Sequence, residues 1–457
     1  MLKYAGLGVL EGNHNLKLGG GKMLTYIKVI GGGLAGSEAA WQIAQRGIKV
    51  KLWEMRPYKM TSAHQSNLLA ELVCSNSLRA HSLTNAVGLL KEEMRLLDSL
   101  IMLCADRTRI PAGGALAVDR TAFAELVTEK LLQHPLIEVI REEAVTVSDN
   151  EITVVATGPL TSDGLAREIA EITSKRYLYF YDAAAPIIYG ETIDKTQAFW
   201  ASRYQKGSAD YLNCPLNMDE YEQFYQALTT AEIYPVKDFE KERCFEGCMP
   251  IEVMAQRGFQ TLLFGPLKPV GLLDEKNEKK VVAVVQLRRD NAAGTLFNLV
   301  GFQTNLKWGE QKRVLRMIPG LEKAEFARYG RMHRNTFINS PQVLRPTTQL
   351  QKYPLILIAG QLSGVEGYVE STASGLLSGI NASRLYHGLA PVVPPRHSAL
   401  GSLLHYITET QADNFQPMNI TFGLLPPLKD KIKDKKRKNS LLAERALEAV
   451  KAWKGQI

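Results

Sequence analysis

The sequence of 457 residues contains few cysteines and no long hydrophobic run. No apolar stretch approaches the roughly 18 residues that a membrane-spanning helix requires, so no membrane span is expected. The N-terminal segment also lacks the apolar core and the cleavage motif of a signal peptide. We expect 1–22, which is glycine-rich and precedes Met23, to be a disordered leader or the result of a misassigned start. Because no targeting signal is evident, we expect a cytoplasmic location.

The cysteines, five in number and irregularly spaced, argue against a disulfide framework. Cys244 and Cys248 have neither a second cysteine pair nor a His-x3-His motif beside them, so no metal site is predicted. A thiol becomes a nucleophile where it is partly exposed near positive charge or free N–H groups. Cys74, near Arg79, and Cys248, near Arg243, are the two candidates. The alternative is that both are small buried hydrophobic residues.

The formal net charge is +8, and the excess of cations is concentrated in 429–438, KDKIKDKKRK. A basic chain is compatible with an anionic partner, although many enzymes with neutral substrates are as basic. The run is interpreted either as a solvated helix face or as a contact with nucleic-acid phosphates.

The segment 27–54, IKVIGGGLAGSEAAWQIAQRGIKVKLWE, predicts a strand, a glycine turn, a helix and a second strand that ends in an acid. Its GxGxxG motif provides a tight turn, a close approach of a pyrophosphate to the backbone, and close packing of helix on strand. Phosphate would bind the free N–H groups at the helix N-terminus, and the acid would accept hydrogen bonds from a ribose. The alternative is a merely tight turn. The predicted cofactor contacts are Gly31, Gly32, Gly33, Leu34, Ala35, Gly36 and Glu54.

A second unit of the same kind, 354–384, contains Gly360, Gly364 and Gly367 between a predicted strand and a helix. Such a helix N-terminus would stabilise negative charge on a reduced flavin. The alternative is a plain βα unit with small residues for packing. Two glycine turns far apart in one chain favour FAD, which is long enough to need both, over NAD. The expected fold is therefore an α/β, Rossmann-like FAD-binding domain of the glutathione-reductase type.

Between these units the pattern changes to short strands and turns rich in glycine, proline and asparagine. We predict an inserted α+β domain over 201–319, and a discontinuous FAD-binding domain over 23–200 and 320–457. Within the first part, 66–100 is predicted to be helical and 109–118 to be a glycine loop. Asp119 is predicted to cap the helix that follows it.

A polar cluster in 286–309 combines cations with aromatic residues. Arg288, Arg289 and Lys307 could meet phosphates or carboxylates, and Phe302 or Trp308 could stack on a ring. The alternative is a polar strand followed by a loop.

Several long blocks, which include ELVCSNSLR, PAGGALAVDR, FEGCMPIEVMAQRG, LRRDNAAGTLFNLVGFQTNLKWG and GQLSGVEGYVES, are not typical of flavoproteins in general. Through them the chain resembles, over about 27–447, the folate- and flavin-dependent tRNA (uracil-5-)-methyltransferases. These are bacterial enzymes related to the larger GidA flavoproteins. Only the segment before Met23 departs from the resemblance.

The resemblance implies an enzyme that forms 5-methyluridine at tRNA position 54, in the T-loop of the T-arm. The carbon would come from 5,10-methylenetetrahydrofolate, and the electrons from FAD reduced by NAD(P)H. Cys248 matches the cysteine that attacks carbon 6 of uracil, and Cys74 matches a second cysteine, a general base or a thiol that guards the flavin. Three alternatives stay open: the same chemistry on 23S rRNA, an NAD(P)H flavoprotein oxidoreductase that needs no RNA, and a non-catalytic tRNA-binding factor. The oligomeric state is undetermined.

Overall fold

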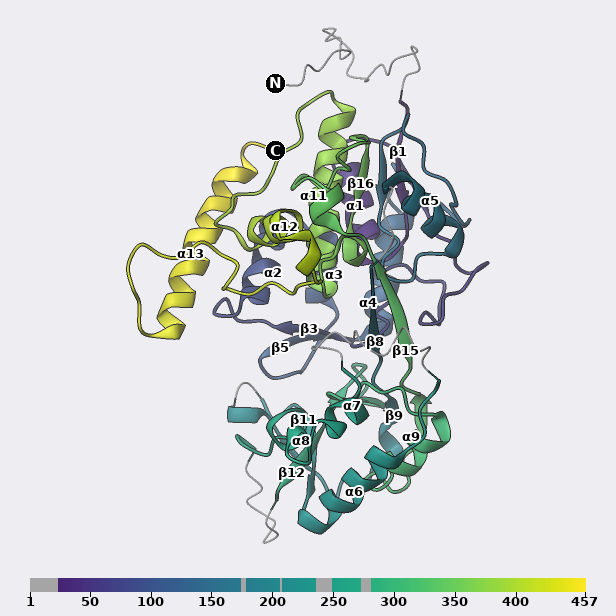
Figure 1. The fold of residues 1–457 in the computed structure, drawn as a ribbon, viewed down its shortest axis with the longest axis vertical. Coiled ribbons are helices and arrows are strands. Elements are labelled where there is room, and N and C mark those ends of the chain that lie inside the picture. The colour runs from purple at the N-terminus through teal and green to yellow at the C-terminus, as the bar shows by residue number, and fades with distance from the viewer. Residues whose placement is uncertain (1–23, 174–177, 206–207, 236–248, 273–280) are drawn as a thin grey trace.

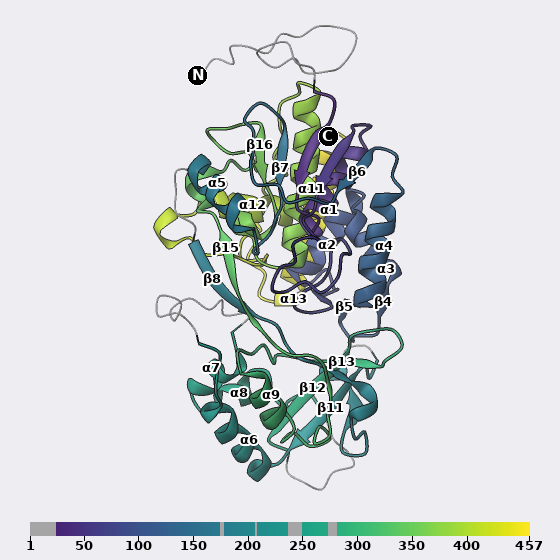
Figure 2. The same cartoon turned by 90° about the vertical axis from the view of Figure 1, so that its right-hand side faces the viewer.

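The protein consists of two bodies arranged along its long axis and joined by an antiparallel pair of strands (Figures 1 and 2). The computed structural model describes residues 24–173, 178–205, 208–235, 249–272 and 281–457. The joining strands are β8 (Leu178–Ala183) and β15 (Met332–Phe337). The predicted leader, 1–22, lies outside the described residues.

The first body is built on a parallel sheet of five strands in the order β16-β7-β1-β2-β6. Most of its residues are buried, as expected for a parallel sheet that helices cover on both faces. β16 follows β7 by some two hundred residues and still pairs with it in register, so both ends of the chain build one nucleotide-binding fold. The strands are β1 (Ile27–Ile30), β2 (Val50–Trp53), β6 (Ile137–Ile140), β7 (Thr153–Val155) and β16 (Ile356–Ile358).

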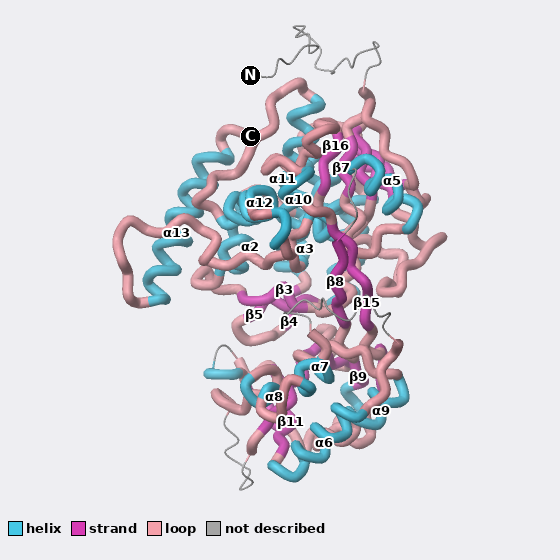
Figure 3. Tube along the Cα trace, viewed as in Figure 1, coloured by secondary structure: helices cyan, strands magenta, loops and turns pink. Residues whose placement is uncertain are grey.

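The two central helices, α1 (Leu34–Ala44) and α11 (Tyr368–Tyr386), pack closely against each other (Figure 1). A Cβ on Gly375 would lie 2.2 Å from the carbonyl oxygen of Ala35, so only glycine permits this approach. The other helices of this body are α2 (Ala86–Leu96), α3 (Leu100–Arg107), α4 (Arg120–Leu132), α5 (Asp163–Thr173), α10 (Ser340–Val343), α12 (Ala399–Glu409) and α13 (Lys435–Lys454). Of these, α2, α3, α4 and α12 contact the central pair, and Figure 3 shows most of them in cyan.

A small antiparallel sheet, β3-β5-β4, lies at the end of the first body that faces the second (Figure 3). It consists of β3 (Ser77–Ala80), β4 (Arg109–Ile110) and β5 (Ala115–Val118). The helix predicted over 66–100 was therefore wrong for its first part, because 66–85 forms turns and β3. The apolar residues of that part, Leu69, Leu72 and Leu78, are buried from an extended backbone rather than from one helix face. The predicted loop at 109–118 likewise contains β4 and β5.

The cap predicted for α4 is confirmed. The Asp119 side chain accepts hydrogen bonds from the N–H groups of Thr121 and Ala122.

The second body contains a six-stranded antiparallel sheet in the order β10-β11-β12-β13-β9-β14. Figure 2 shows the helices on one side of this sheet. Its elements are β9 (Ile187–Tyr189), β10 (Phe199–Ala201), β11 (Tyr211–Leu216), β12 (Ala283–Arg289), β13 (Leu296–Leu299), β14 (Phe326–Arg328), α6 (Met218–Thr230), α7 (Ile251–Gln256), α8 (Thr261–Phe264) and α9 (Trp308–Leu315).

This sheet extends beyond the predicted insertion of 201–319, because β9 and β14 lie outside those bounds. The two strands pair with each other, and β9 also pairs with β13. Their partners are remote in sequence, so no local composition marks them as part of the second body. Among the described helices, none has both the length and the apolar character needed to cross a membrane.

Candidate functional site

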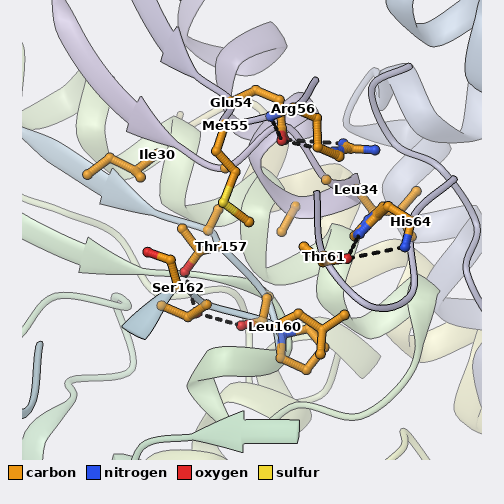
Figure 4. Close-up of a pocket in the computed structure, with 18 of the residues that line it drawn as sticks. Ile30, Leu34, Glu54, Met55, Arg56, Thr61, His64, Thr157, Leu160 and Ser162 are labelled. Atoms are coloured by element: carbon orange, nitrogen blue, oxygen red, sulfur yellow. Dashed lines mark hydrogen bonds and ion pairs between the residues drawn. The ribbon is translucent and has the colours of Figure 1, made fainter. Parts of the chain in front are cut away.

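A cavity of about 1010 Å³, counting the part open to solvent, lies at the carboxyl ends of β1, β2 and β7 and is lined by both glycine turns. Figure 4 shows Glu54 and Arg56 on one side of it, and Thr157, Leu160 and Ser162 on the other. Ligands of open parallel sheets bind at these strand ends. Of the predicted cofactor contacts, the lining includes Gly31, Gly33, Leu34, Ala35, Glu54 and Gly360.

The first glycine turn leaves room for phosphate at the start of α1. Gly31 has a φ of +101°, and a Cβ there would lie 2.6 Å from the carbonyl oxygen of Ala156. A Cβ on Gly36 would lie 1.8 Å from the oxygen of Gly31. At Gly33, the N-cap of α1, a Cβ would meet no atom within 4 Å, and no side chain caps the helix. The start of α1 therefore borders the open space of the cavity, where the helix dipole favours an anion.

Glu54 is a buried, ionised acceptor at the end of β2. Its carboxylate accepts hydrogen bonds from Gly32 N–H at 2.8 Å and from Arg56 Nε at 2.9 Å. Burial raises the pKa of Glu54, but the hydrogen bonds and the charge of Arg56 outweigh this effect and lower it overall. The N–H and Nη2 of Arg56 also donate to it, at 3.0 and 3.2 Å, so four hydrogen bonds reach a carboxylate with roughly four lone-pair sites. Glu54 lines the cavity, and its role as an acceptor for ribose hydroxyls stays a prediction. Gly32 supports this carboxylate rather than the cavity.

His64 lies in the cavity wall together with the ion pair of Glu54 and Arg56 (Figure 4). Its Nδ1 is 2.6 Å from Thr61 Oγ1. Burial, together with the charge of Arg56, lowers the pKa of His64 to about 4. His64 is therefore neutral at physiological pH and offers the cavity no charge.

The second glycine turn runs from β16 through a short 3-10 segment (Gly360–Ser363) to α11. Gly360, Gly364 and Gly367 have φ values of +73°, +83° and +104°, a region that favours glycine. Only Gly360 lines the cavity. Gly364 packs against Phe415, and Gly367 caps α11 beside Arg79.

The residues at this site fit FAD. The N-termini of α1 and α11 both open towards one cavity, and neither has a side-chain cap. The N-terminus of α1 suits a pyrophosphate, and the N-terminus of α11 suits the negative charge of a reduced flavin ring. A dinucleotide long enough to contact both explains why two turns converge here.

Cys74 lies next to this cavity, in a turn whose neighbour Val73 forms part of the lining. The thiol is half-buried. The N–H groups of Cys74 and Ser75 donate to the hydroxyl oxygen of Tyr368, at 2.7 and 3.2 Å. Tyr368 is the first residue of α11 and also lines the cavity. The sequence analysis missed Tyr368, although its place directly after Gly367 was a usable signal.

Two guanidinium groups interact electrostatically with Cys74. One belongs to Arg120, which forms a bidentate ion pair with Asp290 at 2.9 and 3.0 Å. The other belongs to Arg328, whose side chain donates to the carbonyl oxygen of Ala63 at 3.0 Å. Cations near a cysteine favour the thiolate, which is the nucleophilic form.

The structure describes two of the remaining four cysteines. Cys104 and Cys214 are buried, and burial raises the pKa of each thiol to about 12, so neither is a nucleophile at neutral pH. Cys244 and Cys248 lie outside the described residues. Met249, the first described residue after them, is buried, and the Ile251 N–H donates to the carbonyl oxygen of Gln303 in the second body.

The cation and aromatic cluster of 286–309 is only partly buried: the Lys307 side chain is 46% exposed and Trp308 is 51% exposed. Arg288 is buried and hydrogen-bonds Ser75 and Asn76 of the Cys74 turn. Arg289 lies over the Trp200 ring, and Lys307 pairs with a glutamate. Phe302 is buried, and Trp308 stacks on Tyr329. The interpretation of Arg288 as a phosphate or carboxylate contact is corrected accordingly.

Fold and cavity together define an α/β, dinucleotide-binding flavoprotein with a thiol beside its cofactor cavity. The family described as Glucose inhibited division protein A matches residues 26–390. A protein of Pelotomaculum thermopropionicum, named methylenetetrahydrofolate–tRNA-(uracil-5-)-methyltransferase TrmFO, is 61% identical over 94% of this chain and 98% of its own length. A Bacillus licheniformis protein of the same name is 60% identical over 93% and 98%. The chain therefore belongs to the methylenetetrahydrofolate–tRNA-(uracil-5-)-methyltransferase family, within the wider GidA group.

The solved structure of Aquifex aeolicus GidA in its form II crystal has the same fold. It aligns with a TM-score of 0.69 and covers 94% of this chain and 74% of the other. At 17% sequence identity the likeness concerns the fold alone. The prediction of an α/β, Rossmann-like FAD-binding fold is confirmed, and the fold is of the GidA type.

Proposed function

We propose that this enzyme forms 5-methyluridine at position 54 in the T-loop of tRNA. The carbon comes from 5,10-methylenetetrahydrofolate, and NAD(P)H reduces the FAD. The observation that carries the proposal is the shared name of relatives about 60% identical over nearly the whole chain. The Cys74 turn at the edge of the dinucleotide cavity supports it. We also propose a cytoplasmic location, which is consistent with tRNA and folate as substrates.

The proposed chemistry begins with a thiol because carbon 5 of uracil is a poor nucleophile and must first be activated. The Cys248 thiolate adds to carbon 6, and the displaced electron pair makes an enolate that activates carbon 5. Carbon 5 bonds to the methylene carbon of the folate and loses its proton to a base. The carbon–nitrogen bond between this carbon and the folate breaks, and tetrahydrofolate leaves. The one-carbon unit becomes a methyl group with two electrons that reduced FAD would supply as hydride, and the carbon–sulfur bond breaks to return the Cys248 thiolate.

Cys74 is the proposed base for the proton on carbon 5, or the thiol that guards the flavin. Two N–H groups of its turn are held by Tyr368, so the thiol keeps a defined place beside the cavity. Arg120 and Arg328 favour its thiolate form, which can accept a proton. The remaining proposed roles are phosphate contact by the first glycine turn and ribose contact by Glu54.

The basic run 429–438 is the proposed contact with tRNA phosphates. Its lysines and arginine are exposed, and within the described residues none forms an ion pair with a carboxylate. Lys433, Lys435 and Lys438 line a hollow together with 420–423. Lys435 and Lys436 begin α13, where cations oppose the helix dipole, so helix stability does not explain them.

This hollow is linked to the first turn of α11 by side-chain contacts. Ile420, which lines it, donates its N–H to Glu370, and Glu370 pairs with Arg79 beside Gly367. Lys433→Gln with Lys435→Gln should weaken tRNA binding and flatten its salt dependence by about two counterions, without altering FAD content.

An omission assay tests the proposed function. A T-arm RNA, methylenetetrahydrofolate and NADPH or NADH are supplied, each is withheld in turn, and 5-methyluridine is measured. We expect product only with all three, and none from a 23S rRNA fragment. Cys248→Ala should bind FAD, stay yellow and make no product. Methylation of the rRNA fragment alone, or folate-independent NADPH oxidation that Cys248→Ala retains, would overturn the proposal.

A further inference from the structure

Arg288, the buried arginine near the end of β12, crosses from the second body to the Cys74 turn of the first. Its Nε donates to Asn76 Oδ1 at 3.0 Å, and its Nη2 donates to Ser75 Oγ at 2.8 Å. The side chain is also hydrogen-bonded to Tyr211. One guanidinium thus holds the two residues that directly follow Cys74.

Other contacts from the same end of β12 hold the same turn. Asn76 Nδ2 donates to the carbonyl oxygens of Val118 and Arg289, at 2.9 and 3.0 Å. Asp290 pairs with Arg120, which in turn donates to the carbonyl oxygen of Leu72. The turn around Cys74 is therefore held from two sides, by Tyr368 of α11 and by the end of β12 in the second body.

Burying this guanidinium has a cost that its partners only partly offset. Its hydrogen bonds go to neutral groups of Ser75, Asn76 and Tyr211, and burial lowers the pKa of Arg288. An interface stabilised only by packing would not require a buried cation, since apolar side chains do this at lower cost. The planar fork of arginine can, however, fix two acceptors at once, which lysine cannot do.

We propose that Arg288 is a positioning residue for Cys74, and that it makes the place of this thiol depend on how the second body sits against the first. Arg288 is not part of the cavity lining and acts through Ser75 and Asn76. The relevance of this positioning to methyl transfer rests on the proposed function. The effect of Arg288 on the reactivity of the Cys74 thiol does not depend on the proposed function.

The test is the pH dependence of Cys74 alkylation by iodoacetamide in the FAD-loaded protein, followed by mass spectrometry of the Cys74 peptide. In the wild type the thiol lies near Arg120 and Arg328, which favour the thiolate. When Arg288→Met releases the turn, the thiol moves away from these cations, and the alkylation rate at neutral pH should fall ~10-fold. The rate at high pH should equal or exceed that of the wild type, because the thiol is less confined.

The matched control is Arg289→Met, one residue along the same strand, whose side chain lies over Trp200 instead. It should leave the alkylation profile unchanged. Ser75→Ala, which removes one of the two contacts, should give a smaller shift in the same direction, and Arg288→Lys should restore the profile only in part. Ser75→Ala also keeps the test decisive if Arg288→Met fails to fold.

The inference is overturned if Arg288→Met and Ser75→Ala keep the wild-type profile, or if Arg289→Met shifts it equally. A wild-type enzyme that makes no 5-methyluridine but shows the Arg288-dependent profile would refute the proposed function alone. Methylation with a profile that ignores Arg288 would refute the positioning role alone.

Discussion

Replacing Gly33 with alanine separates the two demands on the first glycine turn, that of the protein backbone and that of the cofactor. A Cβ on Gly33 would meet no protein atom within 4 Å, and the residue has an ordinary negative φ of −76°. The apoprotein therefore has room for the methyl group. A Cβ on Gly36 would instead lie 1.8 Å from the carbonyl oxygen of Gly31, so it would force α1 away from the turn.

We expect Gly33→Ala to weaken FAD binding, because its methyl group occupies the space through which the pyrophosphate approaches α1. The loss of one hydrogen bond to a charged group costs about 1.5–3 kcal/mol, which raises Kd about 10- to 150-fold. The free energy of unfolding of the apoprotein should change by less than about 0.5 kcal/mol. Gly36→Ala should lose both FAD affinity and about 1–3 kcal/mol of stability.

FAD affinity is measured by the quenching of flavin fluorescence in titrations of apoprotein, and stability by urea unfolding of the same preparations. Gly309→Ala, in α9 of the second body, is the matched control, since a Cβ there also meets no atom within 4 Å. A Gly33→Ala protein with wild-type affinity for FAD would refute the reasoning. So would an apoprotein as destabilised as Gly36→Ala, since the turn would then be crowded by its own chain.

Three further predictions concern stability, each measured by urea unfolding. Arg120→Met should cost about 3–5 kcal/mol because it strands Asp290 without its buried partner, and a double variant with Asp290→Leu should recover part of the loss. Burial raises the pKa of Glu93 to about 8, so from about pH 4.5 to about 8 the folded state keeps a proton that the unfolded state loses. Wild-type stability then falls as the pH rises, and Glu93→Gln should remove up to about 1.4 kcal/mol per pH unit from that slope; an unchanged slope would contradict the assignment. Asp119→Ala should cost about 1 kcal/mol through the lost cap of α4, whereas Asp149→Ala in an exposed turn should cost nothing measurable.

The features that could be predicted from the sequence are those encoded by neighbouring residues. The glycine turn of 27–54, the cap at Asp119 and the second turn around Gly360 each depend on backbone geometry within a few residues. Both turns together were enough to predict the α/β flavoprotein class. The two reactive cysteine candidates came from local charge and from the resemblance, and of these the structure describes Cys74.

The errors have a common physical origin in contacts between distant segments. The helix predicted over 66–100 was wrong for 66–85, because the apolar residues of that part are buried by pairing of β3 with β5 and by packing of non-helical chain. The predicted insertion of 201–319 was too short to contain β9 and β14. These segments form strands only because β9 pairs with both β13 and β14. No periodicity within either segment reports such a partner.

The sequence by itself determined the cofactor fold, because a glycine turn before a helix specifies a phosphate cradle wherever it occurs. Tertiary structure alone decided what surrounds the thiol. Tyr368 follows Cys74 by 294 residues and Arg288 follows Ser75 by 213, yet both hydrogen-bond the same short turn. Their side chains meet only after two bodies have folded and docked, so the environment of Cys74 is a property of the whole chain.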